Sequence, residues 1–200
     1  MSSDWPSPAD LTTELAAPAI PQRVYPTGMF LALGAILMFF MALISAWVVR
    51  KGLSTPSLEA PIGLPWRLLT FDTIILLASS VTLEAARRSQ KTSDLAGFRK
   101  WWYIATALGL AFLLGQFAAW RILAHQGIYL ATTPDASFFY LFTGAHAIHL
   151  LGGVVGLLIV ARKPLHQLSL ATATRVATMY WHFLTLVWLS IFLVLLLGYK

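Results

Sequence analysis

Five long apolar segments decide what this chain can fold into. They cover residues 27–49, 66–86, 101–123, 137–161 and 175–197. A helix needs ~20 mostly apolar residues to cross the ~30 Å hydrocarbon core of a bilayer. Backbone amides in lipid must be satisfied within their own segment, so spans of this kind are helical. The sequence therefore predicts an all-α integral membrane protein, a bundle of five transmembrane helices.

The composition agrees with a membrane protein. Hydrophobic residues make up 58% of the chain and charged residues 11%, against roughly 45–50% and about 25% in soluble domains. The net charge of +6 comes from short segments between the apolar runs. It forms no basic patch interleaved with aromatic residues, so no nucleic-acid partner is expected. Residues 1–26 form a polar tail rich in Pro and Ser, and residues 27–200 form the membrane domain.

The basic residues predict the orientation. One side of the membrane would carry Arg23, Arg87, Arg88, Lys91, Arg99, Lys100, Arg162, Lys163 and Arg175. The other side would carry Arg50, Lys51, Arg67, Arg121 and Lys200. Because cytoplasmic loops carry the excess of Lys and Arg, the N-terminus is predicted in the cytoplasm and the C-terminus outside.

Three histidines lie within the predicted spans. His146 and His149 are three residues apart and share a helix face, and His182 lies on the next helix. Antiparallel helices could bring the three imidazoles together, and imidazole suits copper, iron and zinc. No carboxylate lies at a matched depth, so hydrogen bonds between helices are the commoner explanation. We expect His146 and His149 to face the bundle interior or a partner.

The other polar residues in the spans have simpler explanations. Asp72 lies near one end of its span and is expected at the membrane interface rather than as a buried proton carrier. Glu84 can pair with Arg87 and Arg88 one turn away. Arg121 is expected to snorkel to the outer interface, with lipid phosphate as the alternative contact.

Aromatic and small residues predict packing. Trp181 and Trp188 are seven residues apart and are expected to form a packed seam. Gly152 and Gly156 form a GxxxG pattern that allows close backbone approach. Asp135 is a candidate cap for the fourth helix. An interfacial belt is predicted for Trp47, Trp66, Trp101, Trp102 and Trp120.

Several local patterns together resemble subunit III of the haem-copper terminal oxidases, the cytochrome c oxidase family. They are Gly28-Met29-Phe30-Leu31 with Met38-Phe39-Phe40, Leu76-Leu77-Ala78-Ser79-Ser80-Val81-Thr82-Leu83-Glu84, Gly115-Gln116, Phe139-Tyr140-Leu141-Phe142-Thr143-Gly144-Ala145-His146-Ala147-Ile148-His149, and Tyr180-Trp181-His182-Phe183. The resemblance covers roughly residues 27–198 and looks like the five-helix form, which lacks two N-terminal helices of longer members.

The resemblance implies a non-redox subunit with no active site of its own. Haem and copper are expected in partner subunits, and this chain is expected to bind neither. It would pack against subunit I, support proton uptake and long-term integrity there, and bind phospholipid. The family's lipid cleft lies between the two missing helices and the other five, so another subunit would have to complete any such cleft here.

Three positions depart from the family pattern. Ile36, Ala119 and Thr185 stand where family members usually carry acids. A proton antenna or carboxylate gate within this subunit is therefore not expected. Asp72 stands where many members have Asn and is an added acid.

These observations predict an accessory subunit III of a respiratory oxidase that reduces oxygen to water in the cytoplasmic membrane of a bacterium. One alternative is the related accessory subunit of nitric oxide reductase, although the Ser-Ser-Val-Thr-Leu-Glu run favours an oxidase. Another is a small proton channel or transporter that uses the histidines as a relay. Contacts to a neighbouring helix, subunit I or lipid are hypothesised for His146, His149, His182, Tyr180, Trp181, Gln116, Asp72, Glu84 and Arg121.

Overall fold

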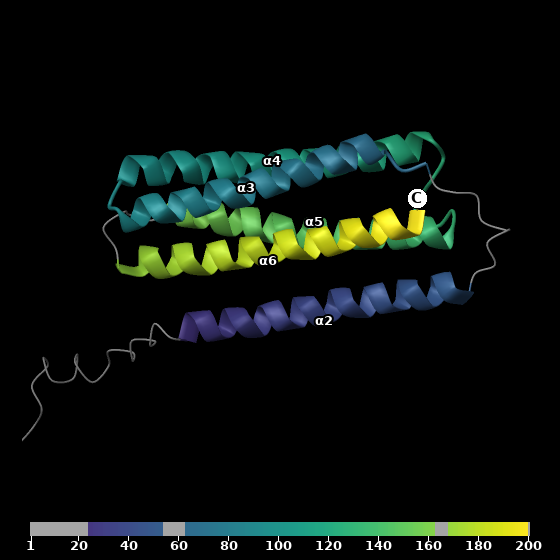
Figure 1. Cartoon of the computed structure of the whole chain (residues 1–200), viewed down its shortest axis with the longest axis horizontal. Helices are drawn as coiled ribbons and strands as arrows, with labels where there is room; N and C mark the ends of the chain where they lie inside the picture. Colours follow the sequence, from purple (N-terminus) through teal and green to yellow (C-terminus); the bar gives the residue numbers. More distant parts are fainter. Residues whose placement is uncertain (1–23, 54–62, 163–167, 200) are drawn as a thin grey trace, which may run out of the picture.

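The computed structural model describes residues 24–53, 63–162 and 168–199, and these residues form five helices. The helices are α2 (Val24–Leu53), α3 (Trp66–Lys91), α4 (Leu95–His125), α5 (Pro134–Ala161) and α6 (Leu168–Tyr199) (Figure 1). Each contains a stretch long and apolar enough to cross a membrane. The prediction of five membrane-spanning helices is confirmed at this level.

The helices extend beyond the predicted spans because polar residues continue or cap them. Helix α4 begins at Leu95, where the Asp94 side chain accepts a hydrogen bond of 2.9 Å from the Gly97 amide. Helix α5 begins at Pro134, a residue favoured in the first helical turn. Its cap is Thr133, whose hydroxyl accepts from the Ala136 amide at 3.1 Å, so the prediction that Asp135 caps this helix is wrong.

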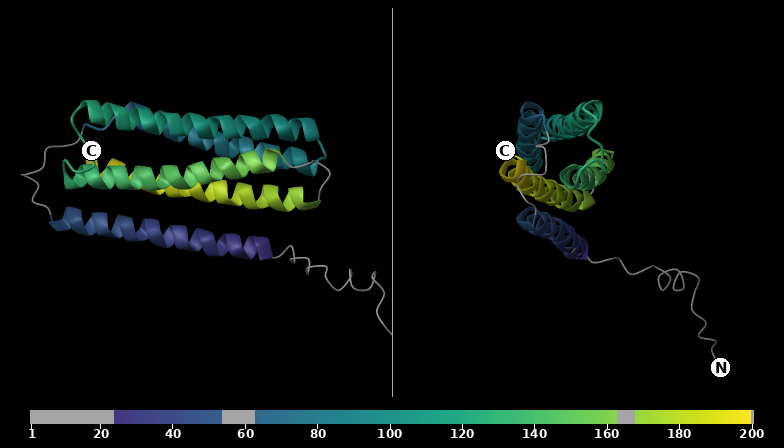
Figure 2. Two further views of the ribbon diagram at one scale, coloured as in Figure 1. Left: turned by 180° about the vertical axis from the view of Figure 1, so that it is seen from behind. Right: turned by 90° about the vertical axis from the view of Figure 1, so that its right-hand side faces the viewer.

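Four of the helices form a closed ring, and α2 lies outside it. Helix α3 contacts α4 and α6, and α5 contacts α4 and α6, which completes the ring. Helix α2 packs against α6 and, less extensively, against α5 (Figure 2). Short connections join α3 to α4 and α4 to α5, so these neighbours run antiparallel.

The interior of the ring is filled by large aromatic side chains. Trp181 and Trp188 on α6 are both fully buried, which confirms the predicted packed seam. Trp188 meets the Phe112 ring edge-on at a centroid distance of 4.8 Å. Trp181 lies against Gly109 and Gly153, and a methyl group added at Gly109 would come within 2.5 Å of the indole. The two glycines therefore make room for the indole between α4, α5 and α6.

The predicted tryptophan belt is only partly correct. Trp101 is 36% exposed, as expected at an interface. Trp102 is buried instead, and its indole donates to the Leu157 carbonyl of α5 at 2.9 Å. Trp47 is also buried and lies close to Gly198 of α6. Each of these two tryptophans packs against a neighbouring helix instead of facing the interface. Trp102 does so through the Leu157 carbonyl of α5, and Trp47 through the space beside Gly198 of α6.

Candidate functional site

Polar side chains of α3 connect this helix to α6 at several levels. The Trp188 indole donates to the Thr73 hydroxyl at 3.0 Å, and the Trp181 indole donates to the Ser79 hydroxyl at 3.0 Å. Both hydroxyls in turn donate to carbonyls of α3 itself. These four polar groups are therefore paired with one another or with the backbone, which keeps them from being left unsatisfied inside a membrane.

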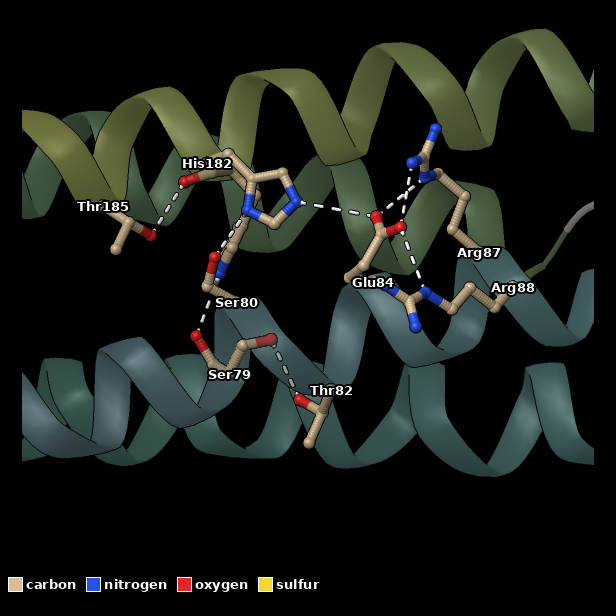
Figure 3. Close-up of polar contacts among 9 residues, drawn as sticks. Ser79, Ser80, Thr82, Glu84, Arg87, Arg88, His182 and Thr185 are labelled. Atoms are coloured by element: carbon tan, nitrogen blue, oxygen red, sulfur yellow. Dashed lines mark hydrogen bonds and ion pairs between the residues drawn. The ribbon is translucent and has the colours of Figure 1, made fainter.

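A second connection between the same helices involves ionisable groups (Figure 3). The Ser80 hydroxyl lies 2.5 Å from His182 Nδ1. The other nitrogen of the imidazole, His182 Nε2, lies 4.0 Å from Glu84 Oε2. Glu84 also receives two bonds of 2.8 Å from the Arg87 guanidinium, and Arg88 lies 3.5 Å from it. The predicted pairing of Glu84 with both arginines is confirmed.

This second cluster is only half enclosed by the protein. The side chains of His182, Arg87 and Glu84 are 38%, 36% and 27% exposed. Arg88 is 79% exposed. The cluster therefore connects α3 to α6 on one side and opens outward from the bundle on the other.

The other two histidines lie elsewhere in the bundle. His146 is fully buried, with its ring 5.1 Å from Trp188 and 5.8 Å from Phe112. Neither of its ring nitrogens has a hydrogen-bond partner among the described residues. The His149 ring lies 5.7 Å from Phe40 of α2, and its Nδ1 lies 2.7 Å from the Ala145 carbonyl of its own helix.

The three imidazoles therefore do not converge. His182 contacts α3, whereas His146 and His149 contact aromatic rings of neighbouring helices. Within the described ranges, no three His, Cys, Asp or Glu side chains are grouped so that they could hold a metal ion. A hydrogen bond between α5 and α6 comes instead from the Tyr180 hydroxyl, which donates to the His149 carbonyl at 3.0 Å.

Asp72 lies inside the protein, which corrects the expectation of an interfacial position. The residue is 1% exposed, and Gln116 of α4 donates to its carboxylate at 3.0 Å. The carboxylate fills the space beside Gly115, which has no side chain to exclude it. The Gly-Gln pair of α4 thus accommodates the Asp72 carboxylate. Arg121 is exposed near the end of α4, as expected for a snorkelling residue.

An ion pair fastens α2 to the ring. Lys51 Nζ lies 2.6 Å from Asp135 Oδ2, which joins the last turn of α2 to the first turn of α5. The two residues are 84 positions apart in the sequence, and nothing in their local patterns links them. Asp135 therefore connects helices instead of capping its own.

A groove of about 700 Å³ lies between α2, α5 and α6. Small residues line much of it, including Gly28, Ala32, Gly152, Gly156, Ala173 and Ala177. The GxxxG glycines face this groove and have no heavy atom of another helix closer than 4.0 Å to an added methyl group. The close helix contact expected there is absent, because in this region α2 stands away from α5.

Two serines and a threonine of α3 that hydrogen-bond to α6 were not among the predicted contact residues. Thr73, Ser79 and Ser80 were visible as polar residues within an apolar span. Thr73 and Ser80 are seven residues apart, which places them two turns apart on one helix face. That pattern indicated a polar face toward a neighbour, but it could not say which neighbour.

The comparisons with known proteins agree with the helix pattern. The family model for cytochrome c oxidase subunit III matches residues 19–199. A protein of Nocardia farcinica named probable cytochrome c oxidase subunit 3 is 31% identical over 196 residues, covering 91% of this chain and 97% of its own. Cytochrome c oxidase subunit 3 of Corynebacterium diphtheriae is 30% identical, covering 88% and 92%. The protein of that name from Synechocystis is 31% identical, covering 86% and 70%. The chain belongs to the cytochrome c oxidase subunit III family.

Proposed function

We propose that this chain acts as the accessory, non-redox subunit III of a respiratory haem-copper oxidase that reduces oxygen to water. The family match over residues 19–199 carries this conclusion. The contacts within the bundle support a structural role, because the polar side chains of α3 bond to α6 and α4. The names of the relatives favour an oxidase over a nitric oxide reductase or an independent channel.

The catalytic subunit I of the oxidase is the main partner in this proposal. Haem and copper belong to that subunit, and this chain stabilises it in the bacterial cytoplasmic membrane. The N-terminus lies in the cytoplasm, because the connection between α3 and α4 is strongly basic, with Lys91, Arg99 and Lys100 near it. The connection between α4 and α5, residues 126–133, contains no Lys or Arg.

We further propose that the groove between α2, α5 and α6 holds a phospholipid acyl chain. Its lining of glycine and alanine leaves an open apolar volume of about 700 Å³. A hydrocarbon chain can fill such a space without unsatisfied polar contacts. Helix α2 supplies one wall of this lipid site through Gly28, Met29 and Ala32.

Cofactor content tests the proposed function. The oxidase is purified through a tag on this chain, the chain is then released with a stronger detergent, and haem and copper are measured in both fractions. We expect both cofactors to remain with the other subunits. Stoichiometric haem or copper on the released chain would overturn the proposal.

A further inference from the structure

A polar stripe runs along the outside of the bundle between α3 and α6. It consists of Ser80, Glu84, Arg87 and Arg88 on α3 and His182 on α6, which Figure 3 shows side by side. At ~1.5 Å of rise per residue, Ser80 lies ~10 Å deeper along the helix than Arg87. The stripe therefore extends from the end of α3 well into the membrane-spanning part of the bundle.

Each helix carries an exposed apolar residue beside the stripe, since Val81 directly follows Ser80 and Leu186 is one turn after His182. Val81 on α3 is 70% exposed and Leu186 on α6 is 63% exposed. Exposed apolar side chains of a membrane-spanning helix contact either lipid hydrocarbon or another transmembrane helix. An ionisable side chain that faces lipid within the bilayer costs ~2.5 to 3.5 kcal/mol near the helix centre.

The ionisable side chains of the stripe find only part of their hydrogen bonds and ion pairs within the chain. The separation of 4.0 Å between His182 Nε2 and Glu84 Oε2 is too long for a hydrogen bond. The 3.5 Å contact between Arg88 and Glu84 leaves most of the Arg88 guanidinium exposed. One carboxylate also faces two guanidiniums, so the stripe carries an excess positive charge near the end of α3.

This face of the bundle is open in the part of the chain that the structure describes. Helix α2 contacts α6 and α5 and lies on the far side of α6 from α3 (Figure 2). Its ion pair to Asp135 keeps it on the α5 side. Nothing within the described ranges therefore covers the polar groups between α3 and α6.

We infer that the α3–α6 stripe is the docking surface for a transmembrane helix of another oxidase subunit. That helix would present a hydrogen-bonding side chain at the level of His182 and Glu84, and an acidic side chain at the level of Arg88. Protein is favoured over lipid tails because only a protein helix offers hydrogen-bonding groups at the depth of His182. The inference rests on the proposed function, since it names the surface through which the subunit binds.

Photo-cross-linking tests this surface directly. The chain contains no cysteine, so single cysteines can carry a benzophenone label. The test positions are Val81→Cys and Leu186→Cys, which flank the stripe without belonging to it. The control is Ile148→Cys, which is 72% exposed on α5, across the ring from α3. In membranes with the assembled oxidase, we expect an adduct with another subunit from both test positions and none from the control.

A charge reversal gives an independent measurement. In Arg88→Glu, retention of the chain in the purified oxidase should fall about tenfold or more, because like charges across an interface cost several kcal/mol. Arg99→Glu is the control, since Arg99 is an exposed residue near the same end of the bundle. Arg88→Gln should have a smaller effect, because it removes the attraction without introducing a repulsive charge.

The possible results distinguish failure of the proposed docking surface from failure of the proposed function. Adducts only with lipid, or equal adducts at Ile148, would overturn the docking surface while co-purification with the oxidase leaves the proposed function intact. A chain that co-purifies with no oxidase subunit at all would overturn the proposed function as well.

Discussion

Trp181 stands where all four helices of the ring meet. Its indole donates to Ser79 of α3, and its ring fits against Gly109 of α4 and Gly153 of α5. A buried indole N–H needs an acceptor, and the surrounding chain supplies one 102 positions away. Association of membrane helices depends on close packing and such bonds rather than on the hydrophobic effect. Single residues can therefore be decisive for this bundle.

Replacing Gly109 by alanine should destabilise the bundle. The added methyl group would lie 2.5 Å from the Trp181 ring, which is held in the core and cannot shift without repacking. Overpacking of this kind costs ~1 to 3 kcal/mol in the free energy of unfolding. Thermal unfolding in mild detergent measures the effect. Gly144→Ala is the matched control, because its added methyl group meets no atom within 4 Å. Equal stability of the two variants would contradict the packing described.

Replacing His182 by leucine should loosen the subunit more than replacing His149 by leucine. His182 joins α6 to α3 through Ser80, whereas the hydrogen bond that the structure gives for the His149 ring, among the residues it describes, is to the Ala145 carbonyl of its own helix. An interhelical bond in a membrane contributes roughly 0.6 to 1.7 kcal/mol. The fraction of chain retained in oxidase washed with detergent reports the loss. Oxygen reduction should be unchanged in complexes that keep the chain, and slower turnover in those complexes would count against a purely structural role.

The five membrane-spanning helices could be predicted from the sequence, but which helix packs against which could not. The length of each apolar run identified all five helices, because crossing a bilayer demands that length. Helix ends were missed where a cap such as Thr133 lies outside the apolar run. Helical spacing placed His146 and His149 on one face but could not show that His182 faces α3. That contact depends on how the helices are arranged around the ring, which residue spacing along one helix does not encode.

Helix α2 lies outside the ring of four helices, and its position should depend on the ion pair at its end. Lys51→Met removes the 2.6 Å contact with Asp135. Spin labels on cysteines introduced at Val48 and Leu193, both 54% exposed, report the distance from α2 to α6. We expect a broader distance distribution in Lys51→Met than in the unchanged chain. Lys91→Met, at the exposed end of α3, is the control, and identical distributions in all three proteins would show that the ion pair does not position α2.

At the scale of the whole molecule, the ring of four helices is a scaffold with two different outer faces. One face holds the apolar groove beside α2, and the other carries the polar stripe between α3 and α6. These surfaces suit different occupants, hydrocarbon in the first and a protein helix in the second. A subunit built in this way can fill the space between a catalytic subunit and the surrounding lipid.

The orientation of the scaffold can be tested with impermeant thiol reagents on intact cells. A cysteine at Ser93, in the exposed connection between α3 and α4, should be protected from the reagent. A cysteine at Tyr129, in the exposed connection between α4 and α5, should be labelled. The basic residues near the first connection are the physical reason for this assignment. The opposite labelling pattern would place the N-terminus outside.

Native mass spectrometry of the intact complex, isolated through a tag on this chain, tests whether the chain is a cofactor-free subunit of a haem-copper oxidase. We expect one copy of the chain with a haem- and copper-containing catalytic subunit, and collisional release of the chain at the mass of the polypeptide, with or without lipid. Release of the chain with haem or copper attached, or its isolation without any oxidase subunit, would show that the chain is not such a subunit.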